Sequence, residues 1–353
     1  MLMHFIIAII FAITVLFAFI EDRLKEIHKI VILAGYVVVF IILATTKSVE
    51  HTADALIYED LFYRNDDIII ELTTEPTFIY ISRTVLAFGG TIGTLFFIYA
   101  ILSIPAKIVI LKSITPFIFT ALLIYIPVYF ELQDMIQIRA AAAAMFLLAS
   151  LIPLCKGRYW LAALLMIGGI LFHYSAIVYL PFLFWRNRKI NLYGRIIIGA
   201  LVPVCFAMYI LKLDLFSIIP SVSSVIGYKM ERYKESSENG KWDELYPLYA
   251  NLYYISKVAM LYLCLYFYDY LSEKHRMAPL LISLFSVSVL FLPAMATIPV
   301  IASRISDLFG LVDCIVFTFL IYLIEPKYWA RIAITIIGMY MIVYNILFTE
   351  YFT

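Results

Sequence analysis

Residues 2–20 read LMHFIIAIIFAITVLFAFI, an apolar stretch without Asp, Glu, Lys or Arg. In a helix that rises 1.5 Å per residue, such a stretch extends about 28 Å, close to the roughly 30 Å of a bilayer's hydrocarbon core. No basic segment precedes the stretch and no A-x-A-like cleavage site ends it. It therefore predicts an uncleaved first membrane span rather than a signal peptide.

The rest of the chain has the same character. It contains 353 residues, of which 64% are hydrophobic and 14% charged. This composition indicates a polytopic α-helical membrane protein, and the apolar runs lack the polar–apolar alternation of a transmembrane barrel. A net charge of +1 excludes a broad nucleic-acid-binding surface. The four cysteines lie in apolar runs and never in a C-x-x-C pair, which predicts neither a disulfide nor a zinc site.

Apolar runs and charged breaks divide the chain into membrane segments. Residues 159–185 form two arms of 13–14 residues with basic ends, KGR and WRNRK. Each arm is too short to cross a bilayer, which predicts a hairpin with its tip, at His173, inside the membrane. With both arms counted there are about twelve segments in one membrane domain, 1–353, and 78–88 is expected to be a short interfacial helix. The other expected spans are 2–20, 29–46, 92–112, 115–131, 136–155, 193–211, 250–270, 278–297, 302–323 and 329–348.

The distribution of basic residues orients these segments. If residues 21–29 are cytoplasmic, alternation places 15 basic and 6 acidic residues inside, with Lys107 and Lys112 among the former. The outer side then holds the remaining 11 basic and 19 acidic residues. The positive-inside rule favours this arrangement, in which both termini face outward.

The unusual polar residues fall on the predicted outer side. The first outer loop, 47–77, has eight acids between Glu50 and Glu75, and Arg83 lies in the short helix after it. ELQDMIQIR at 131–139 is expected to be a second loop, with Gln137 and Arg139 at its end. The long loop 212–249 carries Trp242, Tyr246 and several other aromatic residues.

Arg139 is expected in the first turn of a helix that continues with five alanines. Small residues let a neighbouring helix approach closely, so the guanidinium could be held toward the bundle interior. The alternative is that it reaches the lipid headgroups, as many arginines at span ends do. Arg304, with Asp307 one turn later, also opens a segment at the outer level. Two rigid guanidinium groups at one level are typical of a diphosphate site.

For several of the remaining candidate site residues, a purely structural role is the alternative to a functional one. His173 is either a catalytic imidazole or a satisfied buried histidine, and burying it in an apolar hairpin tip without a role is costly. Asp54 and Tyr58 are spaced to share one face of a helical turn. Trp242 and Tyr246 are either residues of an interfacial aromatic belt or platforms on which sugars stack.

Five short motifs resemble the EpsG family of Wzy-like bacterial polysaccharide polymerases. They are A-D-x-x-x-Y at 53–58, E-P-x-F at 75–78, Q-x-R at 137–139, F-H-Y-S-A at 172–176 and S-R-I-S-D at 303–307. The resemblance implies a GT-C-like helical fold in the bacterial inner membrane. It also implies polymerisation of undecaprenyl-diphosphate-linked oligosaccharides at the outer face of that membrane. The implied partners are membrane lipid and a possible chain-length regulator. By motif it carries functional roles over to Asp54, Tyr58, Glu75, Arg139, His173 and Arg304.

The expected chemistry is glycosyl transfer without a metal or other cofactor. Arg139 and Arg304 are expected to stabilise the diphosphate leaving group, and His173 or Asp54 to take the acceptor's proton. Tyr58, Glu75, Arg83, Gln137, Asp307, Trp242 and Tyr246 are expected to contact substrate. The alternatives are a transporter or flippase of lipid-linked sugars, for which inverted repeats and ionisable residues near the midplane are typical, and a membrane acyltransferase.

Overall fold

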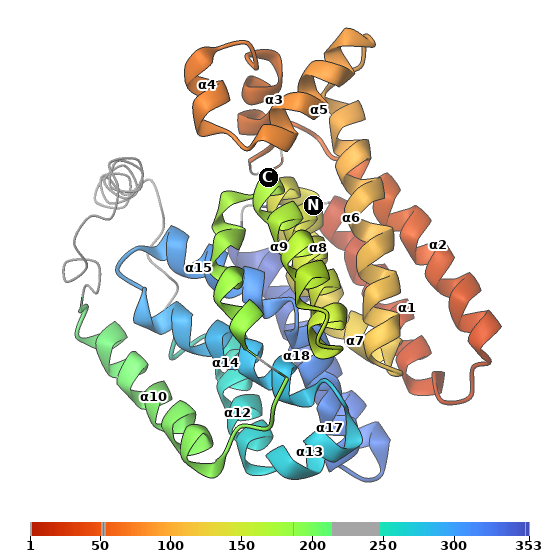
Figure 1. Ribbon diagram of the computed structural model, residues 1–353. Coiled ribbons are helices and arrows are strands. Elements are labelled where there is room, and N and C mark those ends of the chain that lie inside the picture. The colour runs from red at the N-terminus through yellow and green to blue at the C-terminus, as the bar shows by residue number, and fades with distance from the viewer. Residues whose placement is uncertain are drawn as a thin grey trace. The chain divides into compact units, whose positions relative to one another are not determined.

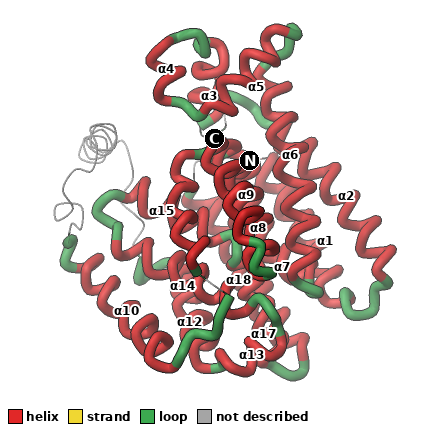
Figure 2. The backbone as a smooth tube through the Cα atoms, viewed as in Figure 1, coloured by secondary structure: helices red, strands yellow, loops and turns green. Residues whose placement is uncertain are grey.

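The computed structural model describes residues 2–50, 52, 54–185, 187–213, 248–349 and 351–352. Most of loop 212–249, including Trp242 and Tyr246, lies outside the described residues. Helices joined by short loops make up almost all of the described chain (Figures 1 and 2). The chain divides into two compact units, Met1–Arg186 with Phe317–Thr353, and Asn187–Val316.

The described helices are those of a multi-pass membrane protein. Seven are long and apolar enough to cross a bilayer, and an eighth span results if the bent pair Pro299–Gly310 and Asp313–Leu323 counts as one. Four further apolar helices are shorter, and they include both arms of the predicted hairpin. The seven are α1 Leu2–Ile20, α2 Glu26–Thr45, α6 Ile92–Ile114, α7 with η1 Ile118–Ile136, α8 Ile138–Cys155, α10 Leu192–Ile210 and α18 Lys327–Phe348.

The two ends of the first unit carry different contacts. At one end Lys112 donates to Glu26 at 2.8 Å, and Arg331 reaches Asp22 at 2.8 Å. At the other end Thr52 forms an isolated β-bridge with Phe352, near the start of α1. Helix α1 separates these ends by about 28 Å. The end with Phe352 therefore carries the first residues of α1 and the last described residues of the chain.

The predicted loop at 131–139 is wrong, because the fourth span continues through it. Helix α7, Ile118–Ile124, runs directly into a π-helix, η1 Tyr125–Ile136, and Glu131, Gln133 and Asp134 are buried in it. Their partners lie on other helices: Asn345 on α18 donates to Glu131 at 2.8 Å, and Lys107 on α6 pairs with Asp134. These contacts replace the water that a run of charges would otherwise require.

The alanines of α8 produce the close helix packing that the sequence predicted. Ala140 to Ala144 are all buried, and α8 packs along α9, Tyr159–Phe172. A Cβ at Gly169 of α9 would lie 3.3 Å from the Ala143 carbonyl oxygen, so the two backbones are almost in contact. Arm α9 ends at His173, and the chain continues as a 3-10 helix, η2 Tyr174–Phe184, that packs back on α9. The two packed arms that meet at His173 are confirmed, and the location of this tip inside the membrane stays a prediction.

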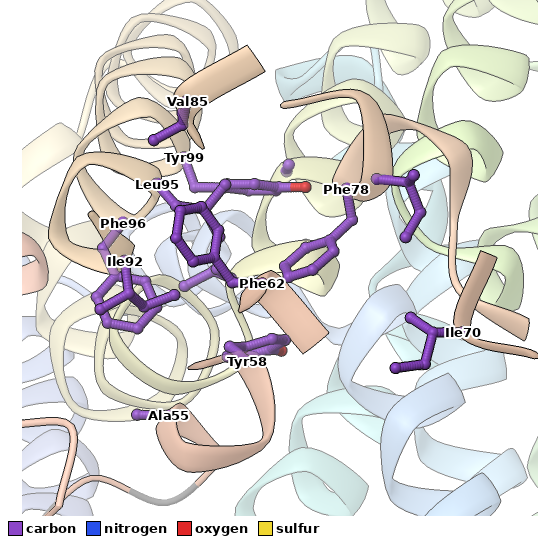
Figure 3. Packing of buried hydrophobic residues seen from close by; sticks show 13 residues of the cluster. Ala55, Tyr58, Phe62, Ile70, Phe78, Val85, Ile92, Leu95, Phe96 and Tyr99 are labelled. Carbon is purple, nitrogen blue, oxygen red and sulfur yellow. The ribbon is translucent and has the colours of Figure 1, made fainter. Parts of the chain in front are cut away.

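Three short helices precede α6. They are α3 Ala55–Tyr63, α4 Ile68–Thr73 and α5 Pro76–Ala87, drawn in orange in Figure 1. Proline is favoured at the first position of α5 because its fixed φ suits a helix and no amide hydrogen is needed there. Tyr58, Phe62 and Phe78 pack against residues of α6 in one apolar cluster (Figure 3). These contacts fasten the predicted first outer loop to the bundle.

The second unit is arranged around α14, Ala278–Ala294. Against it pack α10, α12 Leu252–Tyr266, α13 Tyr268–Lys274, α15 Pro299–Gly310 and α16 Asp313–Val316. Lys257 of α12 is buried, and its ammonium lies 2.9 Å from the Asp313 carboxylate and 2.6 Å from Ser288 of α14. A buried ion pair thus joins three helices of this unit.

Candidate active site

A buried carboxylate connects three separate segments of the first unit. One oxygen of Glu75 lies 2.5 Å from Nη1 of Arg139, and the other lies 3.0 Å from Nδ1 of His173. The backbone N–H of Tyr174 also points to this second oxygen, at 3.4 Å. Glu75 and His173 have only 7% and 11% of their side-chain surfaces exposed, and Arg139 has 19%. The three groups therefore form one ionic cluster largely shielded from solvent.

Each residue of the cluster occupies the end of a helix. Glu75 directly precedes α5, Arg139 is the second residue of α8, and His173 joins α9 to η2 in an extended conformation. The Thr77 hydroxyl of α5 donates to the Leu171 carbonyl oxygen at 2.7 Å and fastens α5 to the hairpin tip. The break at His173 is what turns its imidazole toward Glu75 rather than along a continuous helix.

Aromatic rings enclose the guanidinium of Arg139. Its central carbon lies 5.2 Å from the centre of the Tyr58 ring and 5.4 Å from that of Phe78, within the range of cation–π attraction. Tyr99 packs edge-on against Phe172, and Tyr58, Phe78 and Tyr99 lie near one another in Figure 3. Arg139 is thus held between a carboxylate and two aromatic rings within the protein, and its predicted role stays a prediction.

The electrostatics of the cluster keep Glu75 ionised. Burial opposes the charged form, but the positive charge of Arg139 and the hydrogen bond from His173 outweigh it, and the pKa of Glu75 falls to about 2. An ionised carboxylate accepts the hydrogen of Nδ1, and in that tautomer Nε2 carries the lone pair of the imidazole. The pair can therefore hold a histidine ready to accept a proton at Nε2.

Tyr58 lies at this cluster, whereas Asp54 and Gln137 occupy its surroundings. Asp54 precedes α3 with φ 62°, a left-handed conformation, and the first turn of α3 begins after it. Its charge acts on Lys47, a buried residue whose ammonium donates to the Met135 carbonyl oxygen. Gln137 is half-buried at the junction of η1 and α8.

Arg83 takes part in a different set of contacts. Its guanidinium reaches Glu71 at 2.8 Å and Asp66 at 3.7 Å, and it donates to the Asn65 carbonyl oxygen at 2.9 Å. Glu71 and Asp66 are largely exposed. This arginine ties α4 and α5 together at the surface.

Arg304 and Asp307 lie on α15 of the second unit, and both are half-buried. The charge of Asp307 acts on Lys257 and Asp313, so α15 borders the buried ion pair of that unit. Arg139 belongs to the first unit and Arg304 to the second, and the predicted diphosphate clamp of these two arginines stays a prediction.

The sequence did not reveal a second buried network in the first unit. Lys107 and Asp134 form a fully buried ion pair at 3.0 Å, and Ser103 and Tyr125 each donate to Asp134 at 2.6 Å. Lys107 had counted as cytoplasmic and Asp134 as outer, which their contact contradicts. Without Lys107 the predicted inner side would hold 14 basic and 6 acidic residues (15 less Lys107), so the orientation stays a prediction. The sequence did contain one signal of this network, because Lys107 lies inside an apolar run.

The fold and the cluster define a class of protein, a helical multi-pass membrane protein with an arginine, a histidine and a carboxylate at the ends of short helices. Among the described residues no group of three or more His, Cys, Asp or Glu could hold a metal ion. The chain belongs to the EpsG family, whose model matches residues 29–352. The predicted family is confirmed. No curated protein and no solved structure matches the chain.

Proposed function

We propose that this protein joins undecaprenyl-diphosphate-linked oligosaccharide repeat units by glycosyl transfer at the outer face of the bacterial inner membrane. Membership of the EpsG family suggests a polysaccharide polymerase. The observation that carries the proposal is the Glu75 carboxylate, which holds His173 and Arg139 at one place. His173 can accept a proton there, and Arg139 can stabilise an anion.

In this reaction the acceptor hydroxyl of one repeat unit attacks the anomeric carbon of the growing chain. The new C–O bond forms as the bond to the diphosphate oxygen breaks, and the electron pair leaves with the diphosphate. His173 takes the hydroxyl proton at Nε2, and Glu75 stabilises the imidazolium that results. Asp54 is the less suitable base because its charge acts on Lys47 rather than on this cluster.

Arg139 is the residue proposed to meet the leaving group. Nη1 is bound to Glu75, while Nε is buried and makes no hydrogen bond to the described residues. A phosphate oxygen at Nε would receive a charge-assisted hydrogen bond without loss of the Glu75 contact. Arg304 is proposed as the second cation of the clamp, which requires α15 to approach the same substrate.

The topology belongs to the same proposal. About twelve membrane segments, if the short helices and both hairpin arms are counted, would form a single GT-C-like domain with both termini outside. The charged contacts of Lys112 and Arg331 at the opposite end from Phe352 agree with this arrangement. Loop 212–249, with Trp242 and Tyr246, is proposed to select the acceptor, and a chain-length regulator to act from outside the chain.

A flippase of lipid-linked sugars is a second candidate because of the ion pairs buried in the two units. Lys107 with Asp134, and Lys257 with Asp313, are ionisable groups of the kind that transporters place inside the membrane. A flippase would leave no single repeat unit on the outer face when inactivated, whereas a polymerase would leave the unit there unjoined.

The experiment replaces the arginines and examines polymer ladders at matched membrane expression. Arg139→Ala and Arg304→Ala should each leave single repeat units on the lipid carrier, since loss of one buried donor commonly costs about a hundredfold or more in rate. Lysine should not restore polymer because it lacks the planar fork that grips two oxygens. Arg64→Lys, at an exposed pair with Asp60, is the matched control and should make normal polymer.

Full-length polymer from Arg139→Lys and Arg304→Lys would overturn the clamp. His173→Ala and Asp54→Asn, compared in the same assay, distinguish the two bases. The proposal expects loss of polymer from the first and retention in the second.

A further inference from the structure

The second unit contains a cavity of about 420 Å³ at the end of α10. Its walls come from the last turn of α10, from Tyr249, and from the connection between α14 and α15. A pyranose ring occupies less than half of such a volume. The lining residues are Met208, Tyr209, Ile210, Lys212, Leu213, Tyr249, Pro293, Ala296, Thr297 and Pro299.

A hydrogen bond fixes part of the cavity wall. The Tyr209 hydroxyl on α10 accepts from the backbone N–H of Leu248 at 3.3 Å, and Leu248 is buried. This bond places Tyr249, whose side chain is 65% exposed, beside the last turn of α10. Two tyrosine rings therefore border the cavity on segments that the fold itself holds together.

One residue of the lining ends a helix, and another has an unsatisfied hydroxyl group. Lys212 has φ 51° because it ends α10 in a Schellman motif, in which the Leu213 N–H donates to the Met208 carbonyl oxygen at 3.0 Å. The Thr297 hydroxyl oxygen is buried and has no hydrogen-bond partner among the described residues. An unsatisfied buried hydroxyl is a candidate ligand contact, because a bound molecule can supply the missing hydrogen bond.

The chemistry of the lining favours a negatively charged sugar. Tyrosine rings offer flat apolar faces on which the C–H face of a sugar ring can stack, and Thr297 offers a hydroxyl. None of the described residues that line the cavity is Asp or Glu, while Lys212 supplies a cation. A bound carboxylate would pair with that ammonium and would meet no carboxylate among these described lining residues.

We propose that this cavity is a binding site for an acidic saccharide, with Lys212 contacting the carboxylate, Thr297 a ring hydroxyl and Tyr249 the ring face. The inference rests on the proposed function in one respect, that the saccharide belongs to the lipid-linked repeat unit. The site then selects repeat units that carry a uronic acid or a similar anionic sugar.

The test measures saccharide binding to the full-length protein in nanodiscs of zwitterionic lipid. Saturation-transfer difference NMR with glucuronate should give a signal, and glucose, which lacks the carboxylate, should give a weaker one. Lys212→Gly is the informative variant, because glycine adopts positive φ without strain. It should keep or raise the thermal stability of the protein and weaken glucuronate binding by roughly fivefold or more, as loss of one partly exposed ion pair implies.

Two control variants test whether the glucuronate signal comes from this cavity. Lys189→Gly removes an exposed loop lysine of the same unit and should leave glucuronate binding unchanged. Thr297→Val should weaken both sugars alike without loss of stability, since it removes a hydroxyl that has no partner among the described residues. Equal signals from glucose and glucuronate, or unaltered binding in Lys212→Gly, would overturn the proposal.

A lipid headgroup is the competing source of negative charge. If nanodiscs containing phosphatidylglycerol abolish the glucuronate signal, the cavity holds a headgroup and the saccharide site is rejected. Arg139→Ala protein should bind glucuronate as wild type does. Failure of the polymerase proposal would appear in the polymer ladders, and failure of this site in the NMR signals, so the two remain distinguishable.

Discussion

Replacing Glu75 by glutamine should destabilise the protein by about 3–5 kcal/mol while leaving its shape almost unchanged. Glutamine has the same size as glutamate but no charge, so it leaves Arg139 buried without its counter-ion. Removal of one partner from a buried ion pair costs about this much. The depression of the Glu75 pKa from 4.5 to about 2 by the same contacts corresponds to about 3 kcal/mol, at roughly 1.36 kcal/mol per pKa unit.

The matched control is Glu71→Gln, four residues earlier in the chain. Glu71 also binds an arginine, Arg83 at 2.8 Å, but its side chain is 50% exposed. Water can replace the lost contact there, so little change is expected. The two variants therefore share chemistry and differ in burial.

The assay is equilibrium unfolding of purified protein in mixed micelles, with increasing mole fraction of denaturing detergent. Glu75→Gln should unfold at a clearly lower mole fraction of denaturing detergent than wild type. Glu71→Gln should unfold at nearly the same mole fraction as wild type. A second replacement, Arg139→Gln, made in the Glu75→Gln background should recover part of the loss because it removes the unpaired charge. Equal unfolding of Glu75→Gln and wild type would refute the ionic cluster.

Three further outcomes follow from the structure. Lys107→Met should cost about 3–5 kcal/mol because it leaves the buried Asp134 carboxylate without its cation. Lys107→Met with Asp134→Leu should unfold near wild type, and persistence of the full loss in this double variant would contradict the ion pair. Single cysteines placed near Asn239 and Lys274 in a cysteine-free protein should react with impermeant reagent from outside and from inside, respectively, and the reverse labelling would invert the proposed topology. Because the folded-state pKa of Glu75 lies below 4.5, the stabilisation that its charge provides is complete above pH 4.5 and is lost as pH falls toward 2. The free energy of unfolding of wild type should therefore fall by about 3 kcal/mol more over this interval than that of Glu75→Gln. Parallel pH curves for the two proteins would contradict this expectation.

The sequence by itself was sufficient for the class of fold and for most of its segments. Apolar runs of a bilayer's length predicted the seven long helices, and two arms too short to cross predicted the hairpin around His173. The alanines after Arg139 predicted close packing, and five motifs predicted the EpsG family. These features are local, because length, residue size and motif spacing can be read along one stretch of chain.

Only the tertiary structure decided which charged groups meet. Glu75 lies 64 residues from Arg139 and 98 from His173, and their contact depends on how α5, α8 and α9 end beside one another. For the same reason Asp134, which resembles a loop residue in sequence, is buried against Lys107. A charge enters a helical bundle when a partner on another helix compensates for lost hydration, and that partner is defined by packing across the fold rather than by any local pattern.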